Sequence, residues 1–122
     1  MSKPDRSCVM RLAEGQARIP GPAGERAVMV LRRGPLDVAL SLPQRPSQQT
    51  PHAQDELYFI IRGRGFLLHD SKRDPFESGD ILFVAAGTEH QFEDTSDDLA
   101  LWRIFYGPHG GEDPLTIAST GT

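Results

Sequence analysis

The sequence predicts an all-β domain, built as an antiparallel sandwich or barrel. Short apolar or alternating runs recur about every eight to twelve residues and are separated by Gly, Pro and Asp, whereas the period of an amphipathic helix is scarce. The chain has 122 residues, of which 38% are hydrophobic and 25% are charged. A chain of this size and composition buries one hydrophobic core, so we expect one domain with one site.

The predicted strands follow one another through most of the chain. They comprise residues 27–33, 36–42, 56–61, 65–69, 81–84, 90–92 and 99–106. Gly63 and Arg64 separate two of them and fit a two-residue hairpin loop, because glycine adopts positive φ without steric cost. We expect a leader over residues 1–26 that can add a short edge strand, a barrel over 27–106 and a flexible C-terminal tail over 107–122.

Composition limits the partners and the compartment. The net charge of −4 argues against a nucleic-acid partner, because binding to phosphate backbones is driven mainly by Lys and Arg. No apolar run has the length of a signal sequence or a membrane span, which argues against a membrane partner. Cys8 is the single cysteine, so no intramolecular disulfide forms. We expect a cytoplasmic protein whose partner is a small-molecule ligand or substrate.

The stretch TPHAQDELYFI, residues 50–60, carries the residues most suited to chemistry. Alternate residues of a strand share one face, so Thr50, His52, Glu56 and Tyr58 would all point into the barrel if no bulge intervenes. An ionised glutamate among apolar strands is costly to bury unless a positive group neutralises it. A metal ion beside a neutral imidazole is one such group.

A second histidine follows in the stretch GDILFVAAGTEHQFED, residues 79–94. A turn after residues 81–84 can bring His90 beside His52 and Glu56, which makes a set of two histidines and one carboxylate. This ligand class suits one divalent transition metal per chain, Fe(II), Mn, Ni or Zn, and leaves coordination positions open. The alternative is a hydrogen-bonded network of the same three side chains that binds a small polar ligand directly.

These two stretches resemble the paired motifs of the cupin superfamily. His52, Glu56 and Gly63 fit the second His, the Glu and the Gly of the first cupin motif, and Gly79, Gly87 and His90 fit the two glycines and the His of the second. The resemblance implies a small single-domain cupin with an antiparallel double-stranded β-helix, or jelly-roll, barrel. It also implies that the chain pairs through its outer strands as a homodimer.

Three positions depart from the cupin pattern. Thr50 stands where the first histidine is expected, Ala85 where the proline is expected and Asp94 where the asparagine is expected. Ala85 and Asp94 concern mainly the shape of turns. Thr50 removes a nitrogen donor from the ligand set that the resemblance implies, although its hydroxyl can hold a metal-bound water by a hydrogen bond.

Further side chains are expected around the same cavity. Tyr58 can donate a proton or fill the barrel, and Gln54 can orient a ligand unless a bulge turns it outward. Phe66, Phe92 and Trp102 are assigned to the core or the cavity wall. Arg103 lies in the apolar run LALWRIFY, where we expect an edge residue whose head reaches solvent, with a carboxylate clamp as the alternative.

Two functions fit this set of residues. The first is a metal-dependent enzyme of dioxygenase, isomerase or lyase type, in which Tyr58 or Glu56 moves a proton on a small polar metabolite. The second is a non-catalytic small-molecule-binding or sensory cupin with a degenerate metal site. The fold does not decide between them, because one barrel hosts many activities.

Overall fold

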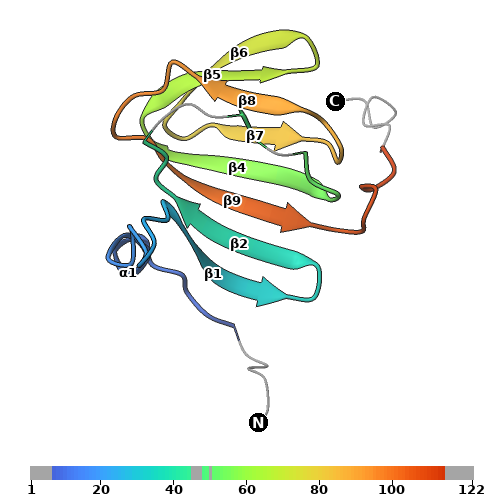
Figure 1. Cartoon of the computed structure of the whole chain (residues 1–122). Coiled ribbons are helices and arrows are strands. Elements are labelled where there is room, and N and C mark those ends of the chain that lie inside the picture. The colour runs from blue at the N-terminus through green and yellow to red at the C-terminus, as the bar shows by residue number, and fades with distance from the viewer. Residues whose placement is uncertain (1–6, 45–47, 50, 115–122) are drawn as a thin grey trace.

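The computed structural model describes residues 7–44, 48–49 and 51–114, which form two antiparallel sheets and one short helix (Figure 1). The elements in chain order are α1 (Leu12–Gln16), β1 (Ala27–Arg33), β2 (Leu36–Ser41), β3 (Gln48–Gln49), β4 (Asp55–Arg62), β5 (Arg64–His69), β6 (Lys72–Glu77), β7 (Ile81–Val84), β8 (His90–Glu93) and β9 (Ala100–Tyr106). The all-β prediction is confirmed, and the strand bounds agree with the sequence to within one or two residues wherever a strand was expected.

The two sheets differ in size and share the chain in an interleaved order. The larger sheet has the strand order β1-β2-β9-β4-β7, and the smaller sheet has the order β3-β8-β5-β6. From β6 onward the chain changes sheet at every step, because β7 and β9 belong to the larger sheet and β8 to the smaller one. This alternation, with antiparallel pairing throughout, gives the jelly-roll barrel that the sequence predicts.

The predicted hairpin between β4 and β5 is wrong, because these strands lie in different sheets. β4 pairs with β7 and β9, whereas β5 pairs with β6 and β8. Gly63 has the expected positive φ, +93°, but it turns a corner from one sheet to the other. The hairpin of this region is instead β5–β6, where Asp70 and Ser71 both have positive φ. The sequence did not predict β6, whose charged residues and Pro75 are typical of an edge strand.

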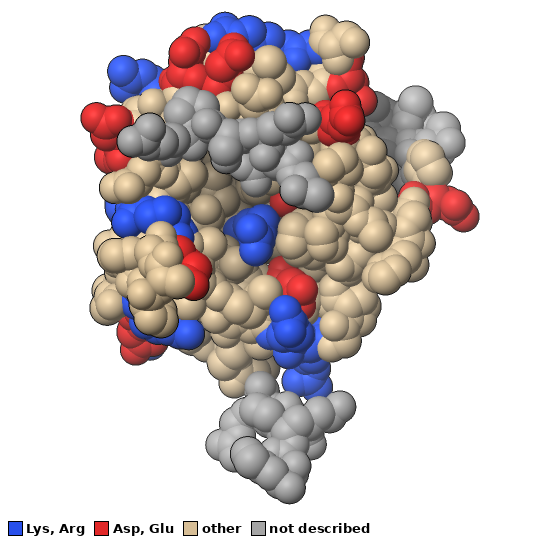
Figure 2. Space-filling view, viewed as in Figure 1, with Lys and Arg blue, Asp and Glu red and all other residues tan. Residues whose placement is uncertain are grey.

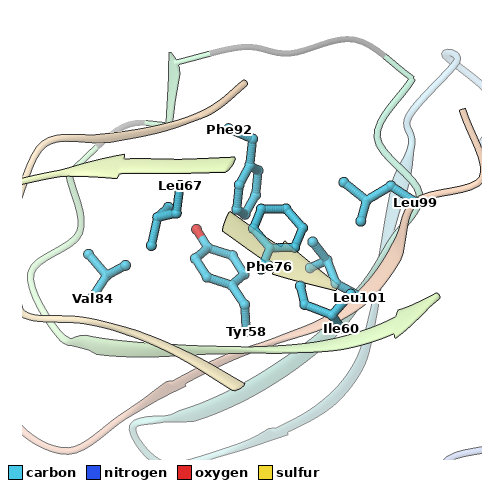
Figure 3. Close-up of a cluster of buried hydrophobic side chains, with 8 residues drawn as sticks. All are labelled: Tyr58, Ile60, Leu67, Phe76, Val84, Phe92, Leu99 and Leu101. Carbon is cyan, nitrogen blue, oxygen red and sulfur yellow. The ribbon is translucent and has the colours of Figure 1, made fainter. Parts of the chain in front are cut away.

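The hydrophobic core lies between the sheets (Figure 3). Its buried members are Tyr58, Ile60, Leu67, Phe76, Val84, Phe92, Leu99 and Leu101. Figure 3 shows Tyr58 and Ile60 rising from β4 towards the opposite sheet, and the Tyr58 ring meets the edge of Phe92 at a centroid distance of 5.0 Å. Residues on alternate positions of β4 therefore point inward, which fixes the face on which the candidate site lies.

The segments outside the barrel are partly structured. The leader contains α1 where the sequence suggested an edge strand, and a Cβ atom at Gly15 would lie 2.7 Å from Leu40, so the helix packs closely on β2. At the other end, Gly110 N–H donates to the Ala53 carbonyl and Glu112 N–H to the Asp55 carboxylate, so residues 107–114 follow the barrel rim. Residues 115–122 lie outside the described residues. Among those described, no helix has the length and hydrophobicity to cross a membrane.

Candidate functional site

Two ionisable side chains project from β4 into the barrel. Glu56 and Tyr58 occupy alternate positions and are 3% and 1% exposed. On β9, Phe105 is the register partner of Glu56, and Arg103 is the register partner of Tyr58. Phe105 and Arg103 therefore share the interior face with Glu56 and Tyr58. A carboxylate and a phenol in this position are removed from water, and each requires a polar partner inside the barrel.

His90 supplies that partner from the opposite sheet. Its Nε2 atom lies 2.9 Å from the Tyr58 hydroxyl and 3.3 Å from Glu56 Oε1, and the imidazole is buried. The Thr88 carbonyl is 2.9 Å from His90 Nδ1 and can only accept, so Nδ1 carries a proton. His90 Nε2 thus accepts a hydrogen bond from the Tyr58 hydroxyl when the ring is neutral and donates one to Glu56 when the ring is charged. We call Glu56, Tyr58 and His90 the acid–base cluster.

The electrostatics of the acid–base cluster favour a phenol and a readily protonated imidazole. Burial, together with the Glu56 carboxylate, raises the pKa of Tyr58 far above its ordinary value, so the phenol keeps its proton at neutral pH. Burial lowers the pKa of His90, but the hydrogen bonds to Glu56 and Thr88 outweigh this effect and raise that pKa overall. The cluster therefore holds a proton donor, a proton acceptor and an imidazole between them.

His52, the third expected ligand, forms no hydrogen bond or ion pair with the acid–base cluster. Its ring stacks on Phe105 with a centroid distance of 3.6 Å and an interplanar angle of 7°. The Gln54 backbone N–H donates to His52 Nδ1 at 3.3 Å. His52 also precedes the first residue of β4, Asp55, so the alternation of strand faces does not extend to it.

Two of the three expected metal ligands lie close together. Two donor atoms that bind one ion at about 2.0–2.2 Å lie roughly 3 Å apart, so Glu56 Oε1 and His90 Nε2 have the spacing of two ligands of one ion. His52 does not join them, and within the described part of the chain no three His, Cys, Asp or Glu side chains are grouped to hold a metal. The predicted three-residue metal site therefore stays a prediction.

Arg103 faces the interior, and the expectation that it lies at an edge is wrong. It lies on β9, the central strand of the larger sheet, and not at an edge. Its Nε atom is buried without a hydrogen-bond partner. Leu101, Arg103 and Phe105 share one face of β9, and this alternation within LALWRIFY is the sequence signal that would have assigned Arg103 to the interior.

Three residues expected around the cavity lie elsewhere, whereas Phe92 lies in the core as expected. Gln54 donates from its side-chain amide to the Pro35 and Gly107 carbonyls, so it ties two loops together. Phe66 faces outward and lies under the Arg73 guanidinium, 3.6 Å from the ring centroid. Trp102 lines an outer apolar pocket of about 370 Å³. Phe92 is buried in the core.

Thr50, the position where the cupin pattern expects a histidine, lies outside the described residues. A pocket adjoins His90. It has a volume of about 410 Å³ and is lined by residues of the β5–β6 hairpin, including His69 and Lys72, and by Glu89 and Gln91 on the β8 side. The pocket gives a small polar molecule room beside the strand that carries His90.

Comparisons with known proteins agree with this architecture. The family model for the cupin domain, Cupin_2, matches residues 41–106. An uncharacterised protein from Streptomyces coelicolor is 37% identical over 60 residues, which are 49% of this chain and 57% of that protein. The chain spans about half the length of the curated relatives it matches.

Solved structures show the same fold at low sequence identity. A Cupin 2 conserved barrel domain protein from Salinispora arenicola aligns with a TM-score of 0.63 and 20% identity, over 84% of this chain and 91% of that one. A protein of unknown function from Rhizobium leguminosarum aligns with a TM-score of 0.67 and 16% identity, over 84% and 99% of the two chains. At these identities the likeness concerns the barrel alone.

Proposed function

The chain belongs to the cupin-domain family, and we propose that its barrel binds a small polar metabolite on which the acid–base cluster acts by proton transfer. The observation that carries the proposal is the shared contact of Tyr58 Oη and Glu56 Oε1 with His90 Nε2 inside the barrel. In isomerase or lyase chemistry, Glu56 accepts a proton from the ligand and Tyr58 donates one to a developing oxyanion. His90 passes protons between them.

The second candidate is a metal-dependent enzyme of dioxygenase or related type, with one divalent Fe, Mn, Ni or Zn ion per chain. The 3.3 Å spacing of Glu56 Oε1 and His90 Nε2 favours it. His52, which stacks on the register partner of Glu56, Phe105, would complete the ligand set. A non-catalytic ligand-binding or sensory role is the outcome that remains if the barrel binds ligands without turning them over.

The outer surface of the barrel and the composition of the chain support two further proposals. The outer face of β4 and β7 exposes large apolar side chains, which a second copy of the chain can cover, so we propose a homodimer. The net charge of −4 and the single cysteine support a cytoplasmic protein without a nucleic-acid or membrane partner.

Proton transfer is tested by following deuterium exchange from D₂O into small carbonyl compounds by proton NMR, with pyruvate and dihydroxyacetone as the first probes. We expect the wild-type protein to accelerate exchange of at least one probe. Glu56→Gln should lose that acceleration, and Tyr58→Phe should reduce it. Glu14→Gln, which removes an exposed carboxylate from α1, is the matched control and should behave as wild type.

A measurement of bound metal per chain, in untagged protein purified without chelator, distinguishes the metal-dependent enzyme from the metal-free one. Near-stoichiometric metal in the wild type that is absent from a His52→Ala/His90→Ala double variant would establish the second candidate. Metal-free protein that still catalyses exchange supports the first. If neither probe exchanges in metal-free or metal-loaded protein, proton transfer at Glu56 is wrong and the non-catalytic role stands.

A further inference from the structure

Arg103 places a positive charge on the interior face of the barrel, beside the acid–base cluster. On β9 it is in register with Tyr58 of β4 and with Ala39 of β2, so its side chain leaves the same face as the Tyr58 ring. Register partners in antiparallel strands have Cβ atoms roughly 5 Å apart. The small side chain of Ala39 leaves room beside Arg103 on the β2 side.

The guanidinium is held in place without a polar partner. Among the described residues Arg103 forms no ion pair and donates no hydrogen bond, and its Nε atom is buried. Its charged group lies over the Phe105 ring, whose centroid is 5.1 Å from the Arg103 Cζ atom, and its charge lowers the pKa of Tyr58 against the larger effects of burial and Glu56. The other neighbour of that ring is His52, which stacks on it. A buried guanidinium donor without an acceptor is costly, which is the usual mark of a group that binds a ligand.

Figure 2 shows that the molecular surface is hollowed near its centre, with Lys or Arg atoms in the hollow beside Asp or Glu atoms. The Phe105 ring lies against one side of the Arg103 guanidinium, which is a favourable cation–π position.

We propose that Arg103 binds the carboxylate group of the metabolite that enters the barrel. A carboxylate presents two oxygens in one plane, which match the parallel N–H groups on the Nε edge of a guanidinium. One guanidinium balances one negative charge, and the neighbouring Glu56 disfavours a second negative charge, so a monocarboxylate fits better than a phosphate dianion.

This inference rests on the proposed function and narrows its substrate class. Because Arg103 and Tyr58 are register partners, a carboxylate held by Arg103 places the carbon atoms next to it within reach of Tyr58 and Glu56. The substrate would be a small hydroxy or keto monocarboxylic acid whose reacting carbon lies one or two bonds from the carboxylate. Arg103 then orients the substrate, and the acid–base cluster moves the proton.

The direct test is an NMR titration of the full chain that follows the Arg103 Nε–Hε resonance. The probes are sodium propionate and its neutral isostere propionamide, with sodium sulfate and sodium phosphate at equal ionic strength. We expect a saturable shift with propionate and none with propionamide. Arg103→Gln should weaken propionate binding by roughly tenfold or more, because hydrogen bonds to charged groups are the strong ones.

Two variants serve as controls for this titration. Arg64→Gln removes one positive charge from the exposed start of β5 and should bind propionate as the wild type does. Arg103→Lys keeps the charge but loses the planar fork, and an intermediate affinity is expected. The inference is overturned if propionamide or sulfate shifts the Arg103 resonance as strongly as propionate, or if propionate leaves it unchanged.

The two proposals can fail separately. Propionate binding that depends on Arg103, with no exchange of any carbonyl probe, would leave the carboxylate site standing and refute proton transfer. Exchange of neutral dihydroxyacetone that survives Arg103→Gln, with no propionate binding, would refute the carboxylate site and leave the acid–base cluster standing.

Discussion

At the scale of single residues, His69 joins the end of β5 to two carboxylates. Its Nε2 lies 2.7 Å from Asp74 and its Nδ1 lies 3.1 Å from Asp70. Lys72 and His90 are its register partners on the neighbouring strands. The hydrogen bond to Asp74 raises the pKa of His69 above its ordinary value, burial opposes this, and Asp70 adds to the rise. The β5–β6 hairpin therefore holds a charged imidazole at mildly acidic pH.

The sign of the pH dependence follows from the raised pKa. His69 binds its proton more tightly in the folded chain, so its contribution to stability is complete below the ordinary pKa of about 6.5 and is lost as pH rises through the folded value. An NMR titration of the imidazole should show a pKa above 6.5 in the wild type. Asp74→Asn should lower that pKa, and Asp97→Asn, in the exposed β8–β9 loop, should leave it unchanged. An unshifted His69 in the wild type would contradict the hydrogen bonds described.

The sequence predicted correctly the orientation of those candidate site residues that lie within β4. Alternation along β4 correctly placed Glu56 and Tyr58 on the interior face, because that segment is continuous strand. The same alternation does not hold for Gln54, which precedes β4 and turns to the Pro35 and Gly107 carbonyls. Counting even and odd positions works only where the backbone stays extended, and both His52 and Gln54 precede the first residue of β4.

At the scale of secondary-structure elements, Gly63 is the corner at which the chain passes from one sheet to the other. Its φ is +93°, and a Cβ atom there would lie 2.8 Å from the Leu99 Cα atom, which belongs to the backbone and cannot rotate away. Gly79 has nearly the same φ, +92°, but a Cβ atom there would meet nothing within 4 Å. A side chain at Gly79 would cause only backbone strain, whereas a side chain at Gly63 would cause backbone strain and steric overlap with Leu99.

Alanine at each corner should destabilise the barrel, and at Gly63 by more. Both substitutions force a side chain into the left-handed region, whereas Gly63→Ala also overpacks the corner, which typically costs a further 1–3 kcal/mol or so. Urea unfolding of Gly63→Ala and Gly79→Ala measures the difference. Equal losses in the two variants would show that Leu99 moves aside freely.

The elements themselves were easier to predict than their pairing. Short apolar runs predicted the bounds of β1 and β7 correctly, because such runs favour strand whichever strand lies beside them. The sequence around Gly63 indicates only that the chain turns, and a hairpin and a corner between sheets need the same positive φ. The strand that follows is chosen by contacts far apart in the sequence, such as that of His90 with Tyr58.

At the scale of the whole molecule, one face of the larger sheet is unusually apolar. Phe59 on β4 is 40% exposed, and Ile81 and Phe83 on β7 are 62% and 51% exposed. The outer pocket lined by Met10, Val38, Phe59, Trp102 and Ile104 continues this face. β7 is also an edge strand of its sheet, so its free backbone groups lie beside the exposed side chains. A face of this kind is a site for association with another protein surface.

We expect a second copy of the chain to cover this face. A two-fold interface would bury the apolar patch of each copy and cover the β7 edge of each copy. Light scattering coupled to size exclusion should therefore give twice the mass of one chain. Phe83→Glu places a charge in the patch and should shift the protein to the monomer, whereas Gln44→Glu adds the same charge at an exposed position outside it and should leave the dimer intact. A wild-type protein that stays monomeric at high concentration would refute the dimer. The Phe83→Glu monomer should still fold, because Phe83 does not belong to the buried hydrophobic core.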